Sequence, residues 1–377
     1  MTQVKTLNIV ADENIPALAK LLPAHCAIQY VPGREITTSD IASADVLLVR
    51  SITKVNAALL DDTAVKFVGS CTIGTDHIDL AYLQQQQIAF ANAPGCNADA
   101  VVDYVLAAMF SYQADMQYWQ GKTAGIVGLG QVGSRLQKRL SGMGLKVIAY
   151  DPFVAAATAS YEEVLGADMV SFHVPITTQG EHASYHMLAA NELKRLKPNA
   201  LLINSCRGKV FDNQALWDFI EAQPDPNKRI YTVLDVYEDE PCPDEKFLQA
   251  LDVATAHIAG YSEQGKIRGS AQVVEAMLAH FDMPSEANDC LASTQRPLQL
   301  EAGTSAEQLL LCAYDIKADS QRFISHFMAA DKSREARAHC FDQFRKNYPV
   351  RTEFSFFKLC NTGPQRDVAL RLLGFKP

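Results

Sequence analysis

Short apolar runs alternate with amphipathic segments along the first ninety residues of the chain. The runs predicted to be strands cover residues 6–11, 46–50, 65–69 and 88–91. Apolar positions at helical spacing predict helices between them, for example over 15–22 and 56–61. This alternation is typical of an α/β fold with a mostly parallel sheet, which is the fold class that we expect.

The same alternation resumes at residue 123. Six further strands are predicted at 124–127, 147–150, 169–173, 200–204, 231–235 and 253–255. Helical segments lie between them at 131–140, 190–196, 212–221 and 245–251. Six is the number of strands in a complete dinucleotide-binding sheet. We therefore expect two α/β domains with a cleft between them.

Two longer helices are predicted outside these series. Residues 98–112 carry an apolar stripe at helical spacing and should form a helix that links the two domains. A second helical run covers 262–281 and ends near Pro284. After residue 285 the pattern changes, and we expect a small α+β appendage. An extra domain that carries no run of polar residues after a strand most often provides an association surface. A regulatory ligand site is the alternative.

A glycine-rich turn follows the first strand of the second series. Gly128, Gly130 and Gly133 are spaced G-x-G-x-x-G and are followed by the helix that contains Gln131 and Val132. The first glycine allows the tight turn, the second lets the backbone approach a pyrophosphate, and the third lets helix and strand pack closely. The positive end of the helix dipole attracts the phosphates. The turn therefore predicts a dinucleotide site.

The next strand indicates which dinucleotide binds there. It ends in Asp151, eighteen residues after Gly133, where an acceptor for the adenosine ribose hydroxyls belongs. A carboxylate at this position would repel a 2′-phosphate, so NAD is expected as the cofactor in preference to NADP.

The composition of the chain excludes several classes of protein. The chain of 377 residues is too long for one ordinary core, and 48% of its residues are hydrophobic. No apolar run is long enough to span a bilayer and no signal-peptide pattern opens the chain, so a cytoplasmic location is expected. The net charge of −9 provides no footprint for nucleic acid. Nine scattered cysteines without a C-x-x-C pair argue for reduced thiols, and no metal site is expected.

Polar residues follow several of the predicted strands, where ligands bind in open α/β sheets. In the second series the runs are Asn204-Ser-Cys-Arg207-Gly208, Asp235-Val-Tyr-Glu-Asp-Glu240-Pro241 and His257-Ile-Ala-Gly260. In the first series, Arg50 and Ser51 follow one strand and Thr72 follows the next. Arg50 alone is as consistent with an ordinary surface cation as with an anion site. Cys206 is expected to be a packing residue rather than a nucleophile.

The glycine turn and these three runs, in this order and spacing, resemble the D-2-hydroxyacid dehydrogenases. This resemblance covers residues 6 to 285 and implies a flavodoxin-like substrate domain beside a Rossmann-type NAD domain. It also implies that Arg207 binds the substrate carboxylate, that His257 exchanges the hydroxyl proton, and that Glu240 supports His257.

The chemistry of the reaction asks for these residue types. Transfer of a hydride from C2 of a hydroxy acid leaves a hydroxyl proton, which a histidine is suited to accept near neutral pH. A carboxylate at Glu240 would stabilise the resulting imidazolium of His257. The planar fork of Arg207 can grip a carboxylate with two hydrogen bonds. His173 also ends a strand, and we favour a binding or packing role for it over catalysis.

Further runs are similar to the branch of this family that acts on 4-phosphoerythronate in pyridoxal 5′-phosphate biosynthesis. These runs are Ala11-Asp-Glu-Asn14-Ile-Pro, Val49-Arg-Ser-Ile-Thr-Lys54-Val-Asn, Thr75-Asp-His-Ile-Asp79, Pro94-Gly-Cys-Asn97 and His257-Ile-Ala-Gly-Tyr261-Ser-x-x-Gly-Lys266. The branch implies a C-terminal dimerisation domain and hence a homodimer. It implies that the substrate contacts Arg50, Ser51, Thr72 and Tyr261. Since a phosphate carries nearly two negative charges, an acidic protein needs such donors.

The full expectation assigns a role to each part of the chain. The substrate domain should be discontinuous, covering 1–94 and 262–285, with the NAD domain at 95–261 and the dimerisation domain at 286–377. The expected NAD contacts are Gly128, Gly130, Gln131, Val132, Gly133, Asp151, His173, Val174, Ser205, Cys206, Asp235 and Gly260. The alternatives are a dehydrogenase of 3-phosphoglycerate or another short hydroxy acid, and an NAD-sensing binding protein such as a corepressor.

Overall fold

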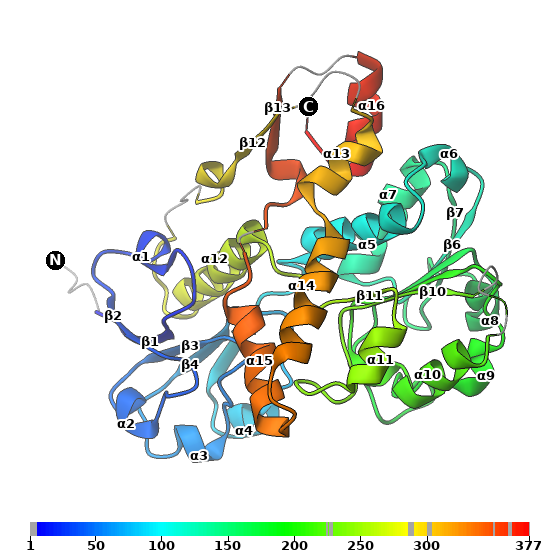
Figure 1. The fold of residues 1–377 in the computed structure, drawn as a ribbon. Helices are drawn as coiled ribbons and strands as arrows, with labels where there is room; N and C mark the ends of the chain where they lie inside the picture. Colours follow the sequence, from blue (N-terminus) through cyan, green and yellow to red (C-terminus); the bar gives the residue numbers. More distant parts are fainter. Residues whose placement is uncertain are drawn as a thin grey trace. The chain divides into compact units, whose positions relative to one another are not determined.

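The computed structural model describes residues 6–223, 225, 229–285, 290–299, 304–349, 351–360 and 364–376 (Figure 1). The chain divides into two compact units. Unit 1 comprises residues 1–97 and 262–295, and unit 2 comprises residues 98–261 and 296–377. Each unit has its own parallel sheet with helices on it.

Unit 1 contains five parallel strands in the order β2-β1-β3-β4-β5, which is the flavodoxin-like order. The strands are β1 (Asn8–Asp12), β2 (Ala27–Val31), β3 (Val46–Val49), β4 (Phe67–Ser70) and β5 (Ala89–Asn92). The helices are α1 (Leu18–Leu21), α2 (Thr38–Ile41), α3 (Ala57–Leu60), α4 (Leu80–Gln85) and α12 (Glu263–His280), followed by η2 (Ala292–Thr294).

Burial explains which strands of unit 1 the sequence predicts. Strands β3 and β4 are buried at every position, so both appear in the sequence as short apolar runs. Strand β2 is an edge strand with no buried position, and the sequence analysis did not predict it. Helix α12 packs against β4 and β5. A Cβ at Gly69 of β4 would lie 2.3 Å from a methyl group of Val273, so glycine permits this close approach.

The larger sheet of unit 2 consists of six parallel strands in the order β7-β6-β8-β9-β10-β11. They are β6 (Thr123–Val127), β7 (Lys146–Tyr150), β8 (Met169–Phe172), β9 (Leu201–Asn204), β10 (Tyr231–Leu234) and β11 (Val253–Ala254). All six were predicted. The strand order reverses between β6 and β8, and this switch point is where doubly wound sheets bind nucleotides.

The helices of the second series are α5 (Ala98–Tyr112), α6 (Met116–Trp119), α7 (Gln131–Gly142), α8 (Tyr161–Leu165), α9 (Ala190–Leu193), η1 (Gly208–Val210), α10 (Asn213–Glu221) and α11 (Glu245–Ala250). Helix α5 is the most buried of them, with thirteen of its fifteen residues inside the core. It contacts α7, β9, α13 and α14. A helix that is covered on all sides carries apolar residues all round, as this one does.

The C-terminal part of unit 2 is a small α+β domain, as expected. It consists of β12 (Arg296–Gln299), α13 (Ala306–Ala313), α14 (Ile316–Ala329), α15 (Arg334–Lys346), η3 (Phe354–Phe356), β13 (Phe357–Cys360) and α16 (Pro364–Leu373). Strands β12 and β13 pair in parallel. Leu309 and Phe354 pack in one cluster with α5, while Phe323 and Phe341 pack in another with residues of β8 to β11.

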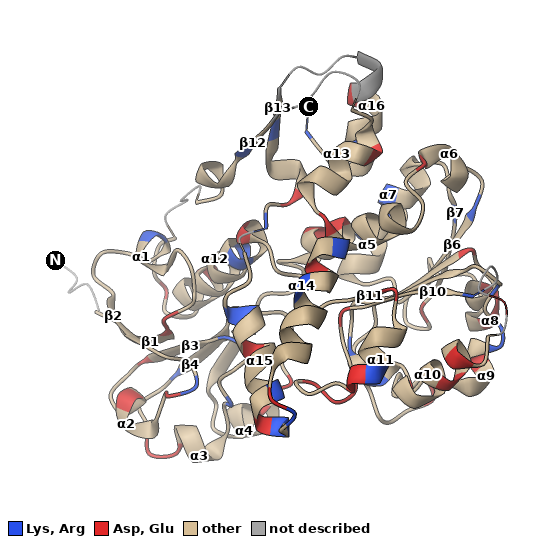
Figure 2. Ribbon diagram, viewed as in Figure 1, with Lys and Arg blue, Asp and Glu red and all other residues tan. Residues whose placement is uncertain are grey.

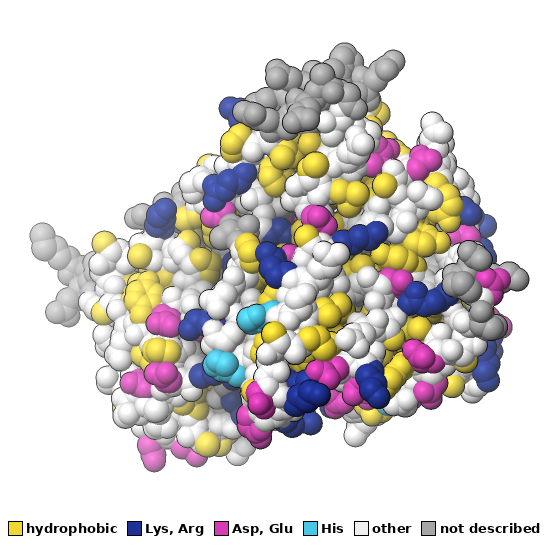
Figure 3. Space-filling view, viewed as in Figure 1, with side chains coloured by type: hydrophobic (Ala, Val, Ile, Leu, Met, Phe, Trp, Pro, Cys, Tyr) yellow, Lys and Arg dark blue, Asp and Glu magenta, His cyan; other side chains and the backbone are white. Residues whose placement is uncertain are grey.

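Helix α14 lies against β11, the edge strand of the six-stranded sheet, and α15 packs on α14 (Figure 1). The backbone N–H of Ala254 in β11 donates to Ser320 Oγ of α14 at 2.9 Å, so a side chain satisfies the edge strand. Arg337 of α15 forms an ion pair with Glu245 of α11. Basic and acidic residues accordingly lie side by side at this end of α15 and α11 (Figures 2 and 3). None of the helices in the described ranges is long and apolar enough to cross a membrane.

Candidate active site

The glycine turn lies at the switch point of the six-stranded sheet. Gly128 has a φ of 92°, and a Cβ there would lie 2.6 Å from the carbonyl oxygen of His173. A Cβ at Gly133 would lie 2.0 Å from the carbonyl oxygen of Gly128. These two glycines therefore let the turn fold tightly against the loop after β8 and against the start of α7, where Gln131 and Val132 lie.

Gly130 differs from its two neighbours in the motif. It is the N-cap of the twelve-residue helix α7, and a Cβ built on it would meet no atom of the described residues within 4 Å. The space above the helix N-terminus is therefore open. A pyrophosphate fits there, because the first N–H groups of a helix and its dipole both favour an anion.

Asp151 follows β7 and holds the glycine turn. Its Oδ2 accepts from the Leu129 N–H at 2.8 Å, and its Oδ1 accepts from the Phe153 N–H at 3.0 Å. The carboxylate is thereby fixed next to the turn, at the strand end where the sequence predicted a ribose acceptor.

The loop after β8 carries the predicted residues His173 and Val174 beside the glycine turn. Nε2 of His173 forms a hydrogen bond with Ser171 Oγ at 2.9 Å. Burial lowers the pKa of His173 to about 3, so the imidazole is neutral near pH 7. This agrees with a binding or packing role rather than with acid–base catalysis.

The turn after β9 is organised by the buried side chain of Asn204. Its Oδ1 accepts from the backbone N–H and the thiol of Cys206, and its Nδ2 donates to the carbonyl oxygen of Arg207 at 3.1 Å. Ser205 lies in the same turn. Burial raises the pKa of the Cys206 thiol, so this cysteine is a poor nucleophile, as expected.

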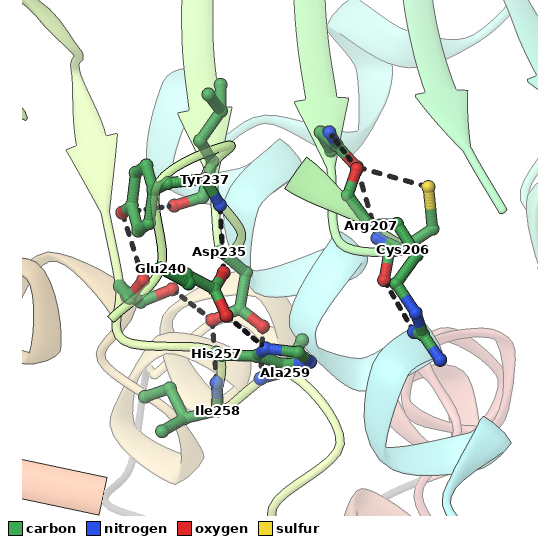
Figure 4. A network of polar contacts seen from close by, with 11 residues as sticks. Cys206, Arg207, Asp235, Tyr237, Glu240, His257, Ile258 and Ala259 are labelled. Atoms are coloured by element: carbon green, nitrogen blue, oxygen red, sulfur yellow. Dashed lines mark hydrogen bonds and ion pairs between the residues drawn. The ribbon is translucent and has the colours of Figure 1, made fainter. Parts of the chain in front are cut away.

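Gly208 brings the turn after β9 against the loop after β10. A Cβ at this glycine would lie 1.9 Å from the carbonyl oxygen of Tyr237, so no side chain fits. This close approach places Arg207 next to the loop that contains Glu240. The guanidinium of Arg207 donates to the carbonyl oxygen of Cys206 at 2.8 Å. Figure 4 shows Arg207, Glu240 and His257 on loops at one end of the sheet.

Asp235, at the end of β10, ties the loop before Gly260 to the sheet. Its carboxylate accepts from the Thr255 hydroxyl at 2.6 Å and from the backbone N–H groups of Ile258 and Ala259, both at 2.8 Å (Figure 4). Burial raises the pKa of this carboxyl, and the nearby His257 and the hydrogen bonds oppose that rise. Asp235 thus sets the conformation of residues 257–260, a supporting role that the sequence did not indicate.

Glu240 and His257 form the central contact of the site. His257 Nδ1 lies 2.8 Å from Glu240 Oε2, while Glu240 Oε1 accepts from the Tyr237 N–H at 2.8 Å (Figure 4). Burial works against the charge of Glu240, but His257, the Tyr237 N–H and Arg345 together lower its pKa. An ionised carboxylate only accepts, so Nδ1 of His257 carries a hydrogen, and Nε2 is the nitrogen left to exchange a proton.

In unit 1, the predicted substrate residues follow neighbouring strands. Strands β3 and β4 pair with Val49 opposite Ser70, so Arg50 and Ser51 lie beside the residues that lead to Thr72. The Thr72 hydroxyl is 2.9 Å from Ser70 Oγ, which also lies 3.1 Å from His77 Nε2. His77 therefore supports this loop, a contact that was not predicted.

Two residues of unit 2 make contacts at the site that the sequence analysis did not predict. The Tyr104 hydroxyl of α5 lies 2.7 Å from Thr255 Oγ1, which anchors the Asp235 network to the buried helix. Arg345 of α15 lies over the ring of Tyr261, 5.5 Å from its centre. Neither contact could be predicted from the sequence, because Tyr104 lies in an apolar helical stripe and Arg345 lies near the end of a helix, and neither pattern indicates a site. No cluster of three or more His, Cys, Asp and Glu suited to a metal ion occurs in the part of the chain that the structure describes.

Comparison with known proteins agrees with this geometry. Residues 103–259 match the family described as D-isomer specific 2-hydroxyacid dehydrogenase, NAD binding domain, and residues 291–374 match a domain of unknown function (DUF3410). The fold is similar to that of a 3-phosphoglycerate dehydrogenase from Entamoeba histolytica, with a TM-score of 0.61, 22% identity and coverage of 76% of this chain and 99% of that one. A D-lactate dehydrogenase from Aquifex aeolicus gives a TM-score of 0.58 with 23% identity over 73% and 95% of the two chains.

Fold, glycine turn and family match together define an NAD-dependent dehydrogenase of the D-2-hydroxyacid class. Similarity over the whole chain identifies a narrower family within this class. An erythronate-4-phosphate dehydrogenase from Cellvibrio japonicus is 40% identical over 98% of this chain and 100% of its own length. One from Shewanella sp. (strain MR-7) is 42% identical over 98% and 99%. The chain belongs to the erythronate-4-phosphate dehydrogenase family.

Proposed function

We propose that this protein oxidises 4-phospho-D-erythronate to (R)-3-hydroxy-2-oxo-4-phosphobutanoate with NAD, a step of pyridoxal 5′-phosphate biosynthesis. One observation carries the proposal. The 2.8 Å contact between Glu240 and His257 lies at the same end of the sheet as Arg207 (Figure 4), in a chain that is about 40% identical, along its whole length, to proteins named for this activity.

Each side chain of the trio has a distinct part in the proposed reaction. Arg207 binds the C1 carboxylate and fixes the orientation of C2. NAD, when bound, accepts the hydride from C2. His257 Nε2 accepts the proton of the C2 hydroxyl, and the Glu240 carboxylate stabilises the imidazolium that results.

The cofactor contacts are proposed at the ends of strands in unit 2. Gly128, Gly130, Gln131, Val132 and Gly133 would hold the pyrophosphate, and Asp151 the adenosine ribose. The remaining proposed contacts lie on the loops that follow β8 to β11: His173, Val174, Ser205, Cys206, Asp235 and Gly260.

Four residues are proposed as contacts for the phosphate end of the substrate. Arg50, Ser51 and Thr72 supply a guanidinium and two hydroxyl groups at the ends of neighbouring strands, and Tyr261 follows Gly260. Such donors suit a phosphate dianion on a protein of net charge −9. If the assignment is correct, Arg50→Ala raises KM for 4-phospho-D-erythronate more than it lowers kcat.

The proposal includes a domain plan and an assembly. A substrate domain comprises 1–94 and 262–285, an NAD domain 95–261, and a dimerisation domain 286–377. The last boundary falls on residues 286–289, which lie outside the described ranges. A homodimer is proposed, because the C-terminal domain carries no run of polar residues after a strand that would form a site of its own. The proposed location is the cytoplasm. Light scattering should give twice the chain mass of 41.4 kDa, and a value equal to one chain would contradict the dimer.

The alternatives are less favoured. A preference for 3-phosphoglycerate or another short hydroxy acid would use the same Arg207, Glu240 and His257. The structures of such enzymes are under 25% identical to this chain and so speak only for the fold. An NAD-sensing binding protein would have no need of an ionised Glu240 held against His257.

Product identification tests the proposed function. The protein is incubated with NAD and 4-phospho-D-erythronate, and the 2-oxo acid is trapped with a hydrazine and identified by mass. One equivalent of trapped product for each NADH is expected. NADH formation without this product, or no NADH formation at all, would overturn the proposal.

A further inference from the structure

Residues 258–261, which follow β11, form a tight turn. The Tyr261 N–H donates to the carbonyl oxygen of Ile258 at 2.8 Å, so Ala259 and Gly260 are the two central residues of the turn. The peptide between these two residues can rotate by about 180° without loss of this hydrogen bond, since turns of types I and II both contain it. The orientation of the central peptide therefore depends on a contact of its own.

The sequence of the turn allows both orientations. Glycine as the third residue permits the type II form, because that form requires a positive φ there and glycine adopts it readily. Gly260, which lies in the described range 229–285, does not have a positive φ. Asp235 does not decide between the two forms, because it binds the N–H groups of Ile258 and Ala259, which belong to the two preceding peptides (Figure 4).

Arg351 supplies a contact to the central peptide. This residue lies between α15 and η3, and its Nη2 donates to the carbonyl oxygen of Ala259. The same Nη2 donates to the carbonyl oxygen of Ala100, in the first turn of α5, at 3.2 Å. The guanidinium carbon lies 4.4 Å from the centre of the Tyr314 ring, and Arg351 is only 6% exposed. A buried guanidinium with these contacts has few alternative orientations.

The main chain next to Arg351 is attached to the same helix. The Phe354 N–H donates to Asp103 Oδ2 of α5 at 2.8 Å, so the segment 351–354 contacts α5 at two points. The ring of Phe354 is buried and stacks on Phe375 with ring centres 4.9 Å apart. A packed segment of the C-terminal domain therefore holds the guanidinium against Ala259.

We propose that Arg351 is a positioning residue, which selects one orientation of the Ala259–Gly260 peptide for cofactor binding. The carbonyl of Ala259 and the N–H of Gly260 lie in one planar peptide, so the bond from Arg351 also sets the direction of this N–H. The inference rests on the proposed function, in which Gly260 contacts the cofactor. Arg351 itself touches neither cofactor nor substrate. It gives the C-terminal domain a part in the site of its own chain.

The test measures NADH affinity by fluorescence titration, which requires no hydroxy acid. Arg351→Met keeps an apolar side chain on the Tyr314 ring and removes every hydrogen-bond donor. If the rotated peptide then predominates by about 10 to 1, the apparent Kd for NADH rises by about 10-fold. Arg351→Lys keeps a cationic donor for the carbonyl oxygen of Ala259 and should recover part of this affinity.

Arg337→Met is the matched control for the loss of a buried arginine from the C-terminal domain. Arg337 is buried, lies over the ring of Phe327 with its guanidinium carbon 5.4 Å from the ring centre, and pairs with Glu245. These contacts are with α14 and α11 rather than with the turn at 258–261. Arg337→Met should therefore lower the unfolding temperature, as Arg351→Met does, and leave the Kd for NADH unchanged.

A second background distinguishes a rotated peptide from lost packing. Alanine at position 260 disfavours a positive φ, so Gly260→Ala should keep the observed orientation even without Arg351. Arg351→Met should raise the Kd for NADH by about 10-fold when residue 260 is glycine and by less than about 2-fold when it is alanine. Each background has its own reference, so the comparison does not depend on the effect of the added methyl group by itself.

An unchanged Kd for NADH in Arg351→Met would overturn the proposal, and so would an equal loss of affinity in Arg337→Met. An equal loss in the glycine and alanine backgrounds would overturn it as well, because Arg351 would then act by packing alone. Turnover is measured separately. If the unchanged protein binds NADH but does not oxidise 4-phospho-D-erythronate, the substrate assignment fails and the result for Arg351 stands.

Discussion

His257 Nδ1 lies 2.8 Å from Glu240 Oε2, although the two residues follow different strands of the sheet. The contact fixes which imidazole nitrogen faces the reaction, because the carboxylate occupies Nδ1. General acid–base catalysis contributes about 10²–10⁴-fold to a rate. We therefore expect His257→Ala to lower kcat by at least about 10²-fold.

Binding of NAD should survive this substitution, because His257 is not among the cofactor contacts. NADH affinity, measured by fluorescence titration, should match that of the unchanged protein. Near-normal turnover in His257→Ala would remove this histidine from the mechanism.

Glu240→Gln keeps the size of the side chain but removes its charge. The loss of an ion partner for the imidazolium should lower kcat by about 10-fold or more, with a smaller change in KM. Steady-state kinetics with saturating NAD measures both constants. An unchanged kcat would show that the 2.8 Å contact has no part in catalysis.

Gly128 and Gly130 should respond differently to alanine. At Gly128 the φ of 92° and the 2.6 Å approach of the His173 carbonyl oxygen strain any side chain, so Gly128→Ala should lower the unfolding temperature. At Gly130 no described atom lies within 4 Å of a Cβ, so Gly130→Ala should fold normally.

The methyl group of Gly130→Ala would nevertheless occupy the space assigned to the pyrophosphate. NAD affinity should fall by at least about 10-fold, while the stability changes by less than about 0.5 kcal/mol. Thermal unfolding and fluorescence titration on the same sample separate the two effects. Unchanged NAD affinity would show that the pyrophosphate does not bind at this helix N-terminus.

The stability of the protein should depend on pH through His173. Its pKa is about 3 in the folded chain and about 6.5 when unfolded, so the unfolded state binds the proton first as pH falls. The contribution of His173 to the free energy of unfolding is fully present above pH 6.5 and is lost as the pH falls below it. The loss at pH 5 is about 2 kcal/mol.

The measurement is the fall in unfolding temperature between pH 7 and pH 5. In His173→Gln this fall should be smaller by a few degrees, while replacement of the exposed His182 by Gln should leave it unchanged. Equal falls in all three proteins would show that His173 is not held neutral by burial.

The edge of the six-stranded sheet gives a test of how firmly the C-terminal domain is attached. Ser320→Ala removes the acceptor of the Ala254 N–H and should destabilise unit 2 by about 1–3 kcal/mol. Ser141→Ala, at an exposed position of α7, is the control and should have no effect. A stable Ser320→Ala variant would show that water or another group satisfies the strand.

Much of this fold could be predicted because buried parallel strands are short apolar runs and their polar ends are visible in the sequence. Asp151, Arg207 and Asp235 each follow such a run. Strand β2 could not be found, since an exposed edge strand lacks that pattern. The contact of Arg345 with Tyr261 was not predicted either, because the two residues are far apart in the sequence and only the folding of α15 brings them together.

The roles of the glycines illustrate the same limit. The motif predicts the turn, but it does not show that Gly208 is equally constrained, because that depends on the Tyr237 carbonyl oxygen 1.9 Å from its missing Cβ. Contacts between loops that follow different strands depend on strand order, which a single sequence leaves open.

The most direct test of the account is the initial rate of NADH formation with 4-phospho-D-erythronate, 3-phosphoglycerate and D-lactate, each over a range of concentrations. We expect the highest kcat/KM with 4-phospho-D-erythronate, and its loss in His257→Ala. A higher kcat/KM with either other acid, or no NADH with any of the three, would contradict the proposed function.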